Sequence, residues 1–493
     1  MLSPNAESGF KLACAANEDL DRWCHQHEDI AWDLSEHPAK KTRWKPERGW
    51  HDAGNFEMYV PSTAPTAQAL LMAYEAHPEL YRDGQLNIPE AGNKIPDLLD
   101  EVRWGLDWVL SMQDPSGGFH NREAVITWSQ HMSADADQAA HWISTVGTAS
   151  TAKGVAVSAL AARIYRDWDA KYAERCEAAA RRGWAFLDAH PERITVDNGP
   201  SEQPLLDDGA DHTREGGARL LASAEMWRSF REPAALEKAK ALLDDPQAQV
   251  KEFLRGAWVN MARWGLIRLA MDAETPEAVR TTAAARIRQA ADEIRKLAEQ
   301  DGYLVASSLD DYYWGSNSNL MERTHLLLAA HRLDQSLEWA LEAAKDQWHW
   351  ILGRNPNGFS MVTRVGKGPT RVYHLEWGRH ERMPPGLLVG GPNAKEGKFL
   401  APGTPAKALL WDNPEPISAA IQIPAHALWH AEQEALWDGG FLRNNDWSNG
   451  WWGMTEGDIY YNANLVLVGT EMVAQMRPPQ PEAQPKAEPQ PNP

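Results

Sequence analysis

Residues 147–189, GTASTAKGVAVSALAARIYRDWDAKYAERCEAAARRGWAFLDA, decide the fold class of this chain. Apolar side chains recur at helical spacing on both sides of a short polar break. This spacing predicts one helix over residues 147–166 and a second over residues 168–189. Because the break between them is short, the two helices are expected to run antiparallel as a helical hairpin.

The same pattern continues outward in both directions along the chain. Gly and Pro divide it into further helical segments, with almost no alternating strand pattern. A dozen antiparallel helices predict an all-α fold, the (α/α)6 barrel, in which six inner helices are ringed by six outer ones. A helical solenoid is the alternative, but no sequence repeat recurs at a fixed period. Besides the first pair, the predicted helices span residues 62–77, with Ser62 as its cap, 94–113, 216–230, 232–244, 254–271, 276–300, 317–333, 335–352 and 459–476, with a partial helix near 5–16.

The composition of the 493 residues excludes several classes of protein. Hydrophobic residues make up 43% and charged residues 24%, which is typical of a soluble globular protein. The 49 basic and 69 acidic residues give a net charge of −20, which argues against a nucleic-acid partner. No apolar stretch approaches the ~18 residues of a transmembrane helix. The N-terminus also lacks the basic region and apolar core of a signal peptide.

The numbers of tryptophan and cysteine residues lead to two further expectations. The chain has 24 Trp against 11 Tyr and 9 Phe. Indole rings mostly serve burial, although their flat faces also make platforms for sugar rings. Three cysteines cannot form a disulfide framework in a chain of this length. Cys176 falls within a helical pattern and is expected to be a small core residue.

Two long segments resist helical assignment. Residues 24–60 and 353–457 are rich in Gly, Pro, Trp and His and are predicted to be ordered loops, which at this length are usually functional. The last stretch, 478–493, is PPQPEAQPKAEPQPNP, a Pro-rich linker or tail that has no means of packing a core. The predicted folded domain is therefore residues 1–477.

Six motifs occur in an informative order along the chain. They are GWHDAGNFEMYV (49–60), IPDLLDEVRWGLDWVLSMQDPSGG (95–118), YYWGSNS (312–318), WILGRNPNGFSMVT (350–363), PPGLLVGGPN (384–393) and EGDIYYNA (456–463). Together they resemble the catalytic module of glycoside hydrolase family 9, whose members are mostly endoglucanases, over about residues 14–476. The resemblance implies an (α/α)6 barrel and hydrolysis of a β-linked glucan, cellulose-like or related, with inversion. In that mechanism one carboxylic acid protonates the glycosidic oxygen and a carboxylate base activates water.

The resemblance also implies the catalytic residues. Glu456 stands where the family has its acid, ahead of a Tyr-Asn-Ala helix start. On the water-activating side the family has Asp-Ala-Gly-Asp, whereas this chain has Asp52-Ala53-Gly54-Asn55. The second Asp of the family motif is taken as the principal base. An amide can orient water, but it has no accessible pKa and is not a practical base.

Three interpretations of Asn55 follow. Asp52 acts as the base alone while Asn55 orients the water, or another carboxylate such as Glu57 or Asp412 takes over. In the third, the protein binds glycans and has lost hydrolysis. Release of new reducing ends distinguishes the first two from the third.

Substrate contacts are implied by two of the motif regions. Tyr312, Tyr313 and Trp314 resemble a family segment that lines the cleft. After the ILGRNP stretch, family members often carry a His-His-Arg cluster that holds sugar hydroxyls. His374 fits one His position, but Leu375 stands at the Arg position, with possible substitutes downstream at His380 and Arg382.

An insertion distinguishes this chain from most relatives. Residues 408–455, between the Pro-Ala-Lys segment and the acid, carry six tryptophans that include Trp451 and Trp452. These rings are predicted to stack on sugars, with a packed surface subdomain as the alternative. A cleft closed at one end by the insertion would favour exo over endo attack, including exo-action on another β-glycan such as a glucosaminide.

Four residues form the ligand set of a structural zinc site. Cys14, Cys24, His25 and His51 provide two thiolates and two imidazoles, a set that suits closed tetrahedral zinc. The spacing is not that of a zinc finger. It resembles the zinc site of family 9 members that carry a preceding immunoglobulin-like domain. Zinc here would tie the 24–60 loop to the end of the first helix and fix the segment that carries Asp52.

The resemblance also bears on calcium binding, on the partners of the protein and on the compartment in which it acts. The stretch HTREGGARLLASAEMW lacks the Asp/Glu pair with which many relatives bind calcium, so no calcium site is predicted. The expected partner is a polysaccharide or oligosaccharide, with no membrane or nucleic acid, and the protein is expected to be a monomer. Relatives act in the secreted or periplasmic compartments. The short segment before Cys14 suggests a natural short form or a fragment of a longer precursor.

Overall fold

The computed structural model describes residues 32–33, 48–54, 56–125, 141–196, 212–244, 261–308, 311–312, 314–356, 358, 360–367, 385–392 and 456–476. Within these residues the chain is mostly helical. The predicted helix near 5–16, the tail 478–493 and residues 254–260 lie outside them. The α-helices are α2 (Val60–Ala76), α3 (Asp97–Ser111), α4 (Thr148–Tyr165), α5 (Ala170–Ala189), α6 (His212–Phe230), α7 (Pro233–Leu243), α9 (Ala262–Met271), α10 (Glu277–Ala298), α11 (Ser316–Leu333), α12 (Glu338–Ile351) and α17 (Ile459–Met476), with a short 3-10 helix at Pro78–Leu80.

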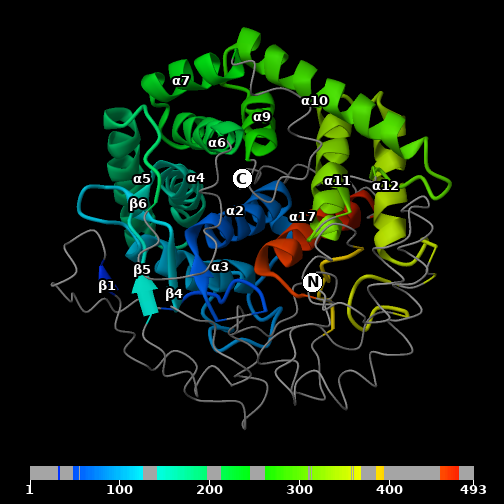
Figure 1. Cartoon of the computed structure of the whole chain (residues 1–493), viewed down its shortest axis with the longest axis horizontal. Helices are drawn as coiled ribbons and strands as arrows, with labels where there is room; N and C mark the ends of the chain where they lie inside the picture. Colours follow the sequence, from blue (N-terminus) through cyan, green and yellow to red (C-terminus); the bar gives the residue numbers. More distant parts are fainter. Residues whose placement is uncertain are drawn as a thin grey trace, which may run out of the picture.

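The helices form a closed double ring, which confirms the predicted (α/α)6 barrel. The inner ring runs α2, α4, α6, α9, α11 and α17, and α17 packs back against α2 (Figure 1). Among the described residues, the outer helices α3, α5, α7, α10 and α12 each pack on the inner helix that precedes them in sequence. Each hairpin therefore places one helix in each ring. The last helix closes the ring against the first described one.

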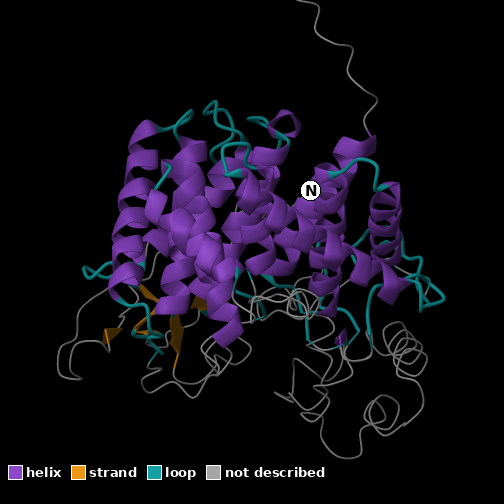
Figure 2. Cartoon of the chain, turned by 90° about the horizontal axis from the view of Figure 1, so that it is seen from above, coloured by secondary structure: helices purple, strands orange, loops and turns teal. Residues whose placement is uncertain are grey.

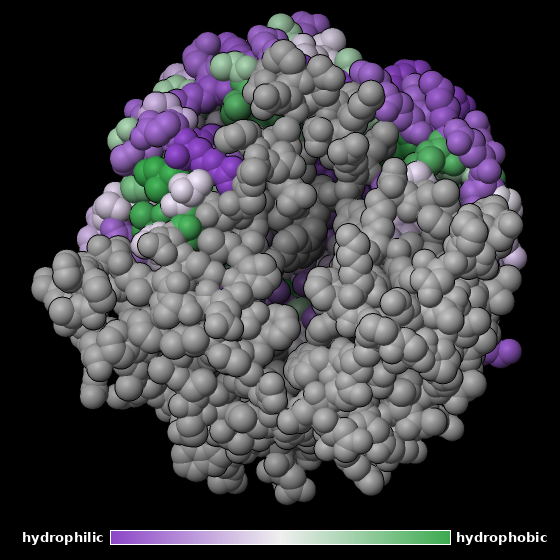
Figure 3. All heavy atoms as spheres, viewed as in Figure 1, coloured by the Kyte–Doolittle hydropathy of each residue, from purple (hydrophilic) through white to green (hydrophobic). Residues whose placement is uncertain are grey.

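Burial separates the two rings. Every residue from Ser316 to His331 of the inner helix α11 is buried, because this helix is covered on all sides. The outer helix α10 buries one stripe, including Val279, Ala283, Ile287 and Ile294, and leaves the opposite face to solvent. The described atoms at the periphery of the ring are accordingly mainly hydrophilic (Figure 3).

The start of α2 differs from the prediction and shows how a buried helix tolerates proline. The helix begins at Val60, so Ser62 lies inside it and is not its cap; the Ser62 hydroxyl donates to the carbonyl of Tyr59 at 3.3 Å. Pro65 also lies inside the helix and has no N–H for the carbonyl of Pro61. The buried Lys153 of α4 supplies the missing donor, with its Nζ 3.2 Å from the Pro61 oxygen.

Short strands, which the sequence pattern did not predict, gather at one end of the barrel (Figure 2). In the four-stranded sheet, β2 pairs antiparallel with β4, with Met58 opposite Glu123 and Tyr59 opposite Arg122. Strand β2 leads directly into α2, so the sheet sets the entry angle of the inner ring. Part of the predicted 24–60 loop is therefore strand. The strands are β1 (Trp32–Asp33), β2 (Met58–Tyr59), β4 (Arg122–Val125) and β5 (His141–Ile143), in the order β1-β5-β4-β2, and a separate pair of β3 (Phe119–His120) and β6 (Val146–Gly147).

Aromatic side chains fill much of the core. Trp50, Trp108, Trp264 and Trp350 are among the largest fully buried side chains, which confirms burial as the main use of tryptophan in the described residues. Cys176 of α5 is fully buried, as predicted.

Among the described helices, none combines the length and the apolar character needed to cross a membrane.

Candidate active site

The loop that carries Asp52 is fixed to the outer helix α3. The N–H of Gly49 donates to the carbonyl of Trp104 at 3.2 Å, and the Trp104 indole donates back to the Gly49 carbonyl at 2.7 Å. Gly49 has φ +108°, and a Cβ there would lie 2.9 Å from the Cβ of Trp108, so only glycine fits. The N–H of Asp52 then donates to the carbonyl of Glu57 at 2.9 Å, which closes the turn around Gly54.

The start of α17 lies against this turn. The N–H of Ile459, the first residue of α17, donates to the carbonyl of Asp52 at 3.0 Å. The carbonyl of Glu456 accepts from the N–H of Gly390 at 3.0 Å, and Val389 pairs with Gly457 as an isolated bridge. Backbone contacts therefore hold Asp52 and Glu456 in neighbouring positions, although the two residues lie far apart in the sequence.

The Glu456 carboxyl is buried and held by two donors. Its Oε1 accepts from the N–H of Gly54 at 3.0 Å, and its Oε2 accepts from the indole Nε1 of Trp314 at 2.6 Å. The residue is 8% exposed. Trp314 precedes α11, where Gly315 has φ +81° and no room for a Cβ beside the Tyr461 hydroxyl. Segments before α2, α11 and α17 thus meet at one carboxyl group.

Burial raises the pKa of both predicted catalytic carboxyls. It raises the pKa of Glu456 to about 8; the donors from Gly54 and Trp314 oppose this rise, and the charge of Asp52 adds to it. Burial also raises the pKa of Asp52 to about 7, opposed by the Ser62 hydroxyl and reinforced by the charge of Glu57. Near neutral pH Glu456 is therefore mostly protonated, while Asp52 is divided between its protonated and ionised forms.

Asp52 has a buried carboxyl oxygen without a hydrogen-bond partner among the described residues. The residue is 6% exposed, and its Oδ1 has no hydrogen-bond partner among the described residues. A buried carboxylate oxygen without a protein donor is a site where water or a polar ligand group binds. Glu57, the alternative base, is also buried, and its Oε2 accepts the hydroxyl of Tyr59. Asp412 and Asn55 lie outside the described residues.

Asp458 is a third buried carboxyl that the sequence analysis missed. It is 4% exposed, and its Oδ1 accepts the N–H groups of Tyr460 at 2.6 Å and Tyr461 at 3.1 Å, which caps α17. Burial, followed by the charges of Asp52 and Glu456, raises its pKa well above the ordinary value. An Asp immediately before the first residue of a helix is a capping signal, so the TEGDIYYNA motif already contained the information.

The structure covers only part of the predicted substrate contacts. Trp314 bonds directly to Glu456, and Tyr312, which lies near it in sequence, is buried with 4% exposed. The roles of these two residues in substrate binding stay predictions. The other predicted contacts lie outside the described residues; they are Tyr313, His374, Trp451 and Trp452.

Comparison with known families shows which family the chain belongs to. A sequence model of the family described as Glycosyl hydrolase family 9 matches residues 16–469. The chain belongs to glycosyl hydrolase family 9. The match includes Asp52 and Glu456, the inner helices α2, α4, α6, α9 and α11, and α17 as far as residue 469.

Individual family 9 relatives are similar to the chain at moderate identity. Endoglucanase D of Acetivibrio thermocellus is 28% identical over 381 residues, which cover 75% of this chain and 58% of that protein. The chain thus spans little more than half the length of this curated relative. A metagenome-derived family 9 endoglucanase of known crystal structure is 31% identical with a TM-score of 0.73, covering 90% of this chain and 74% of the other.

A third family 9 comparison bears on the predicted zinc site. A zinc-binding triple mutant of the family 9 endoglucanase J30 is 28% identical with a TM-score of 0.69, covering 86% of this chain and 73% of the other. Of the four predicted ligands only His51 is described; it is buried, and its ring lies 5.1 Å from that of Phe56. No group of three or more possible metal ligands occurs among the described residues. Cys14, Cys24 and His25 lie outside them.

Proposed function

We propose that this chain hydrolyses a β-1,4-linked glucan by an inverting acid/base mechanism in which Glu456 is the acid. The observation that carries the proposal is the burial of Glu456, which raises its pKa to about 8 and keeps the carboxyl protonated at neutral pH. The Gly54 and Trp314 donors fix the orientation of that carboxyl. A positioned, protonated carboxylic acid is what a departing glycosidic oxygen requires.

Asp52 is the base in this mechanism. Its Oδ1 has no partner among the described residues, whereas an oxygen of Asp458 is occupied by two N–H groups of α17. Burial and the charges of Asp52 and Glu456 also raise the pKa of Asp458 well above its ordinary value, which disfavours its ionised form. Asp52, with a pKa of about 7, ionises in the range where Glu456 keeps its proton. Asn55 orients the attacking water.

The substrate class follows from the relatives. Endoglucanase D and the metagenome-derived enzyme are both named as endoglucanases, so cellulose-like β-1,4-glucan is the first substrate to test. Endo- and exo-action differ in product size. Random internal cleavage releases mixed oligosaccharides, and attack from one end releases a single short product.

The predicted zinc site forms part of this proposal. The two thiolates and two imidazoles of Cys14, Cys24, His25 and His51 suit tetrahedral zinc, and His51 directly precedes Asp52. Zinc bound there would fix the backbone on the N-terminal side of the base, the same side as the anchor that Gly49 and Trp104 provide. The metal has a structural role and takes no part in the reaction. We further propose that the protein acts outside the cytoplasm, where polymeric glucans are found, and as a monomer.

The test compares the parent protein with Glu456→Gln on β-glucans and defined oligosaccharides. New reducing ends are measured, and the anomer released first is identified by NMR. Turnover with inverted product, lost by at least about 100-fold in Glu456→Gln, would support the proposal. Glu237→Gln on the exposed face of α7 is the matched control and should keep full activity. If the parent protein binds glycans but does not hydrolyse them, its function is glycan binding and the proposal of hydrolysis is wrong.

A second pair of variants tests the assignment of the base. Asp52→Asn should lower kcat by about 100-fold or more, because no accessible proton acceptor is left at Oδ1. Asp458→Asn should keep kcat within about tenfold, because an asparagine caps a helix nearly as well as an aspartate. The reverse pattern, with Asp458→Asn inactive and Asp52→Asn active, would transfer the role of base to Asp458.

A further inference from the structure

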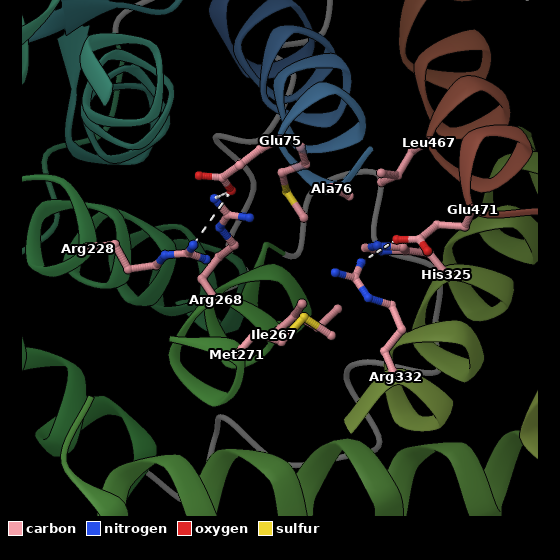
Figure 4. A pocket seen from close by; sticks show the side chains of 11 residues that line it. Glu75, Ala76, Arg228, Ile267, Arg268, Met271, His325, Arg332, Leu467 and Glu471 are labelled. Carbon is pink, nitrogen blue, oxygen red and sulfur yellow. Dashed lines mark hydrogen bonds and ion pairs between the residues drawn. The ribbon is translucent and has the colours of Figure 1, made fainter. Parts of the chain in front are cut away.

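A cavity of about 210 Å³ lies inside the inner ring, at the end opposite Glu456. Its walls come from the last turns of the inner helices, including Glu75 of α2, Arg228 of α6 and Glu471 of α17. Figure 4 shows Glu75 and Arg228 on one side of the opening and Glu471 on the other. Glu75 is separated from Val60, at the active-site end of α2, by about 20 Å of helix. The cavity is therefore separate from the catalytic carboxyls.

One wall of the cavity contains more cations than anions. Arg268 donates through Nε to Glu225 at 2.7 Å and through Nη2 to Glu75. Arg163, behind this wall, donates to Glu75 at 2.8 Å and to Glu225 at 2.9 Å. Burial would raise the pKa of Glu75 and Glu225, but the charges of the nearby arginines lower it and keep both carboxylates ionised. Arg268 and Arg163 therefore already pair with the two carboxylates.

Arg228 is the third cation of this wall. Among the described residues its one ion pair is with Glu75, at 3.6 Å, and it donates a hydrogen bond to none of them. Burial and the charges of Arg268 and Arg163 lower the pKa of Arg228 to about 10. Its side chain is 17% exposed and lines the cavity. With Arg228 the wall has three positive and two negative charges, and the guanidinium has unused donors.

The opposite wall provides no anion for Arg228. There Glu471 pairs with Arg332 and, at 3.2 Å, with the Nε2 of His77. Burial lowers the pKa of His325 to about 3, so its imidazole is neutral, and its Nδ1 has no partner among the described residues. The ionised groups of this wall balance each other. Asp272, which acts on the charge of Arg228 from outside the lining, is already held by Arg231. Among the groups that line the cavity, the excess positive charge is therefore located at Arg228.

The remaining lining is apolar. Met72, Ile267, Met271 and Leu467 contribute most of it. We propose that this cavity binds a small monocarboxylate with an apolar body of a few carbon atoms, and that its carboxylate accepts hydrogen bonds from Arg228. The single negative charge of such a ligand neutralises the excess positive charge, and its apolar body covers the methionines. The volume of the cavity equals that of about seven water molecules, which suits a ligand of this size. This inference is independent of glucan hydrolysis.

The test measures ligand binding to the full chain by thermal denaturation and calorimetry. The probes are butyrate, its uncharged analogue butyramide, and inorganic phosphate. Butyrate should raise the Tm saturably, and butyramide should have no effect because it lacks the charge. Arg228→Gln should weaken butyrate binding by about tenfold or more, since a hydrogen bond to a charged group is lost.

Two controls separate a binding role of Arg228 from a structural one. Without ligand, Arg228→Gln should melt at or above the Tm of the parent, because the folded state disfavours this charge. Arg288→Gln on the exposed face of α10 should bind butyrate like the parent, and Arg228→Lys should bind with intermediate affinity. Equal butyrate binding in Arg228→Gln, a response to phosphate alone, or no response to any probe would overturn the proposal.

Discussion

The protonation states of Glu456 and Asp52 are linked at the residue scale. Each carboxyl is buried, and an ionised Asp52 makes it harder for Glu456 to lose its own proton. Their two titrations therefore belong to the pair as well as to the separate residues. A site of this kind works only where the base has lost its proton and the acid has kept its own.

The pH dependence of hydrolysis follows from these pKa values. We expect kcat/KM to follow a bell-shaped curve, rising near pH 7 as Asp52 ionises and falling near pH 8 as Glu456 loses its proton. Initial rates on a soluble oligosaccharide across the neutral and alkaline range provide the measurement. Activity that stays constant far above the pKa of Glu456 would exclude this residue as the acid.

The hydrogen bond from Trp314 is expected to influence the pH at which activity falls on the alkaline side of that curve. Its indole donates to Oε2 of Glu456 and stabilises the ionised form, so its removal should raise the pKa of Glu456. Trp314→Phe is therefore expected to shift the alkaline limb upward by about one pH unit. Trp227→Phe, which loses an indole bond to Thr275 far from the site, should leave the limb unchanged. A lower kcat with an unmoved limb would mean that Trp314 only packs against the site.

The sequence indicated Glu456 and Asp52 as candidate catalytic carboxyls but did not predict their contacts. Glu456 and Asp52 were identified from family motifs, each local in sequence. Asp458 was missed because its importance depends on burial beside two other carboxyls that come from separate segments. The donor from Gly54 to Glu456 likewise joins residues 402 positions apart, and no local pattern predicts such a contact.

At the scale of elements, periodicity located the helices to within a few residues. The helix predicted over 147–166 spans Thr148–Tyr165, and the one predicted over 459–476 spans Ile459–Met476. Strands of two to four residues are too short to show an alternating pattern, so β2 was not predicted. The start of α2 was misplaced because Ser62 suggested a cap, whereas strand β2 continues to Tyr59 and the helix follows directly.

The contact between Lys153 and Pro61 predicts a coupling between α2 and α4. Lys153→Met leaves the buried Pro61 carbonyl without this donor and should cost about 1–3 kcal/mol of unfolding free energy. Pro65→Ala restores an N–H within α2 that can satisfy the same carbonyl. Lys153→Met should therefore cost less in the Pro65→Ala background, which a double-mutant cycle by denaturant unfolding measures. Additive costs would show that Lys153 stabilises the protein through its other contacts.

At the scale of the whole molecule, the inner helices all point their N-termini toward one end. The described groups of the candidate active site lie at that end, before α2, α11 and α17, and the cation-rich cavity lies at the other. Helix count and hairpin connectivity were sufficient to predict this barrel. They did not predict the cavity, because it depends on which side chains five separate helices bring together.

Zinc binding is tested at this scale as well. The purified protein should contain about one zinc per chain by elemental analysis, and Cys24→Ala should lose it and melt at a lower temperature. Cys176→Ala removes the buried thiol of α5, which is not a predicted ligand, and should keep the metal. Equal zinc content in both variants, or no zinc in the parent, would contradict the site.

The closure of the inner ring has a consequence for folding. Asp52 precedes the first described inner helix and Glu456 precedes the last, so the pair exists only after α17 has docked against α2. Contacts of such large sequence separation form late, because a long loop must be closed before they stabilise the chain. Recovery of hydrolysis during refolding should therefore lag behind the recovery of helical structure, and enzymatic activity would serve as a kinetic marker for the final docking step.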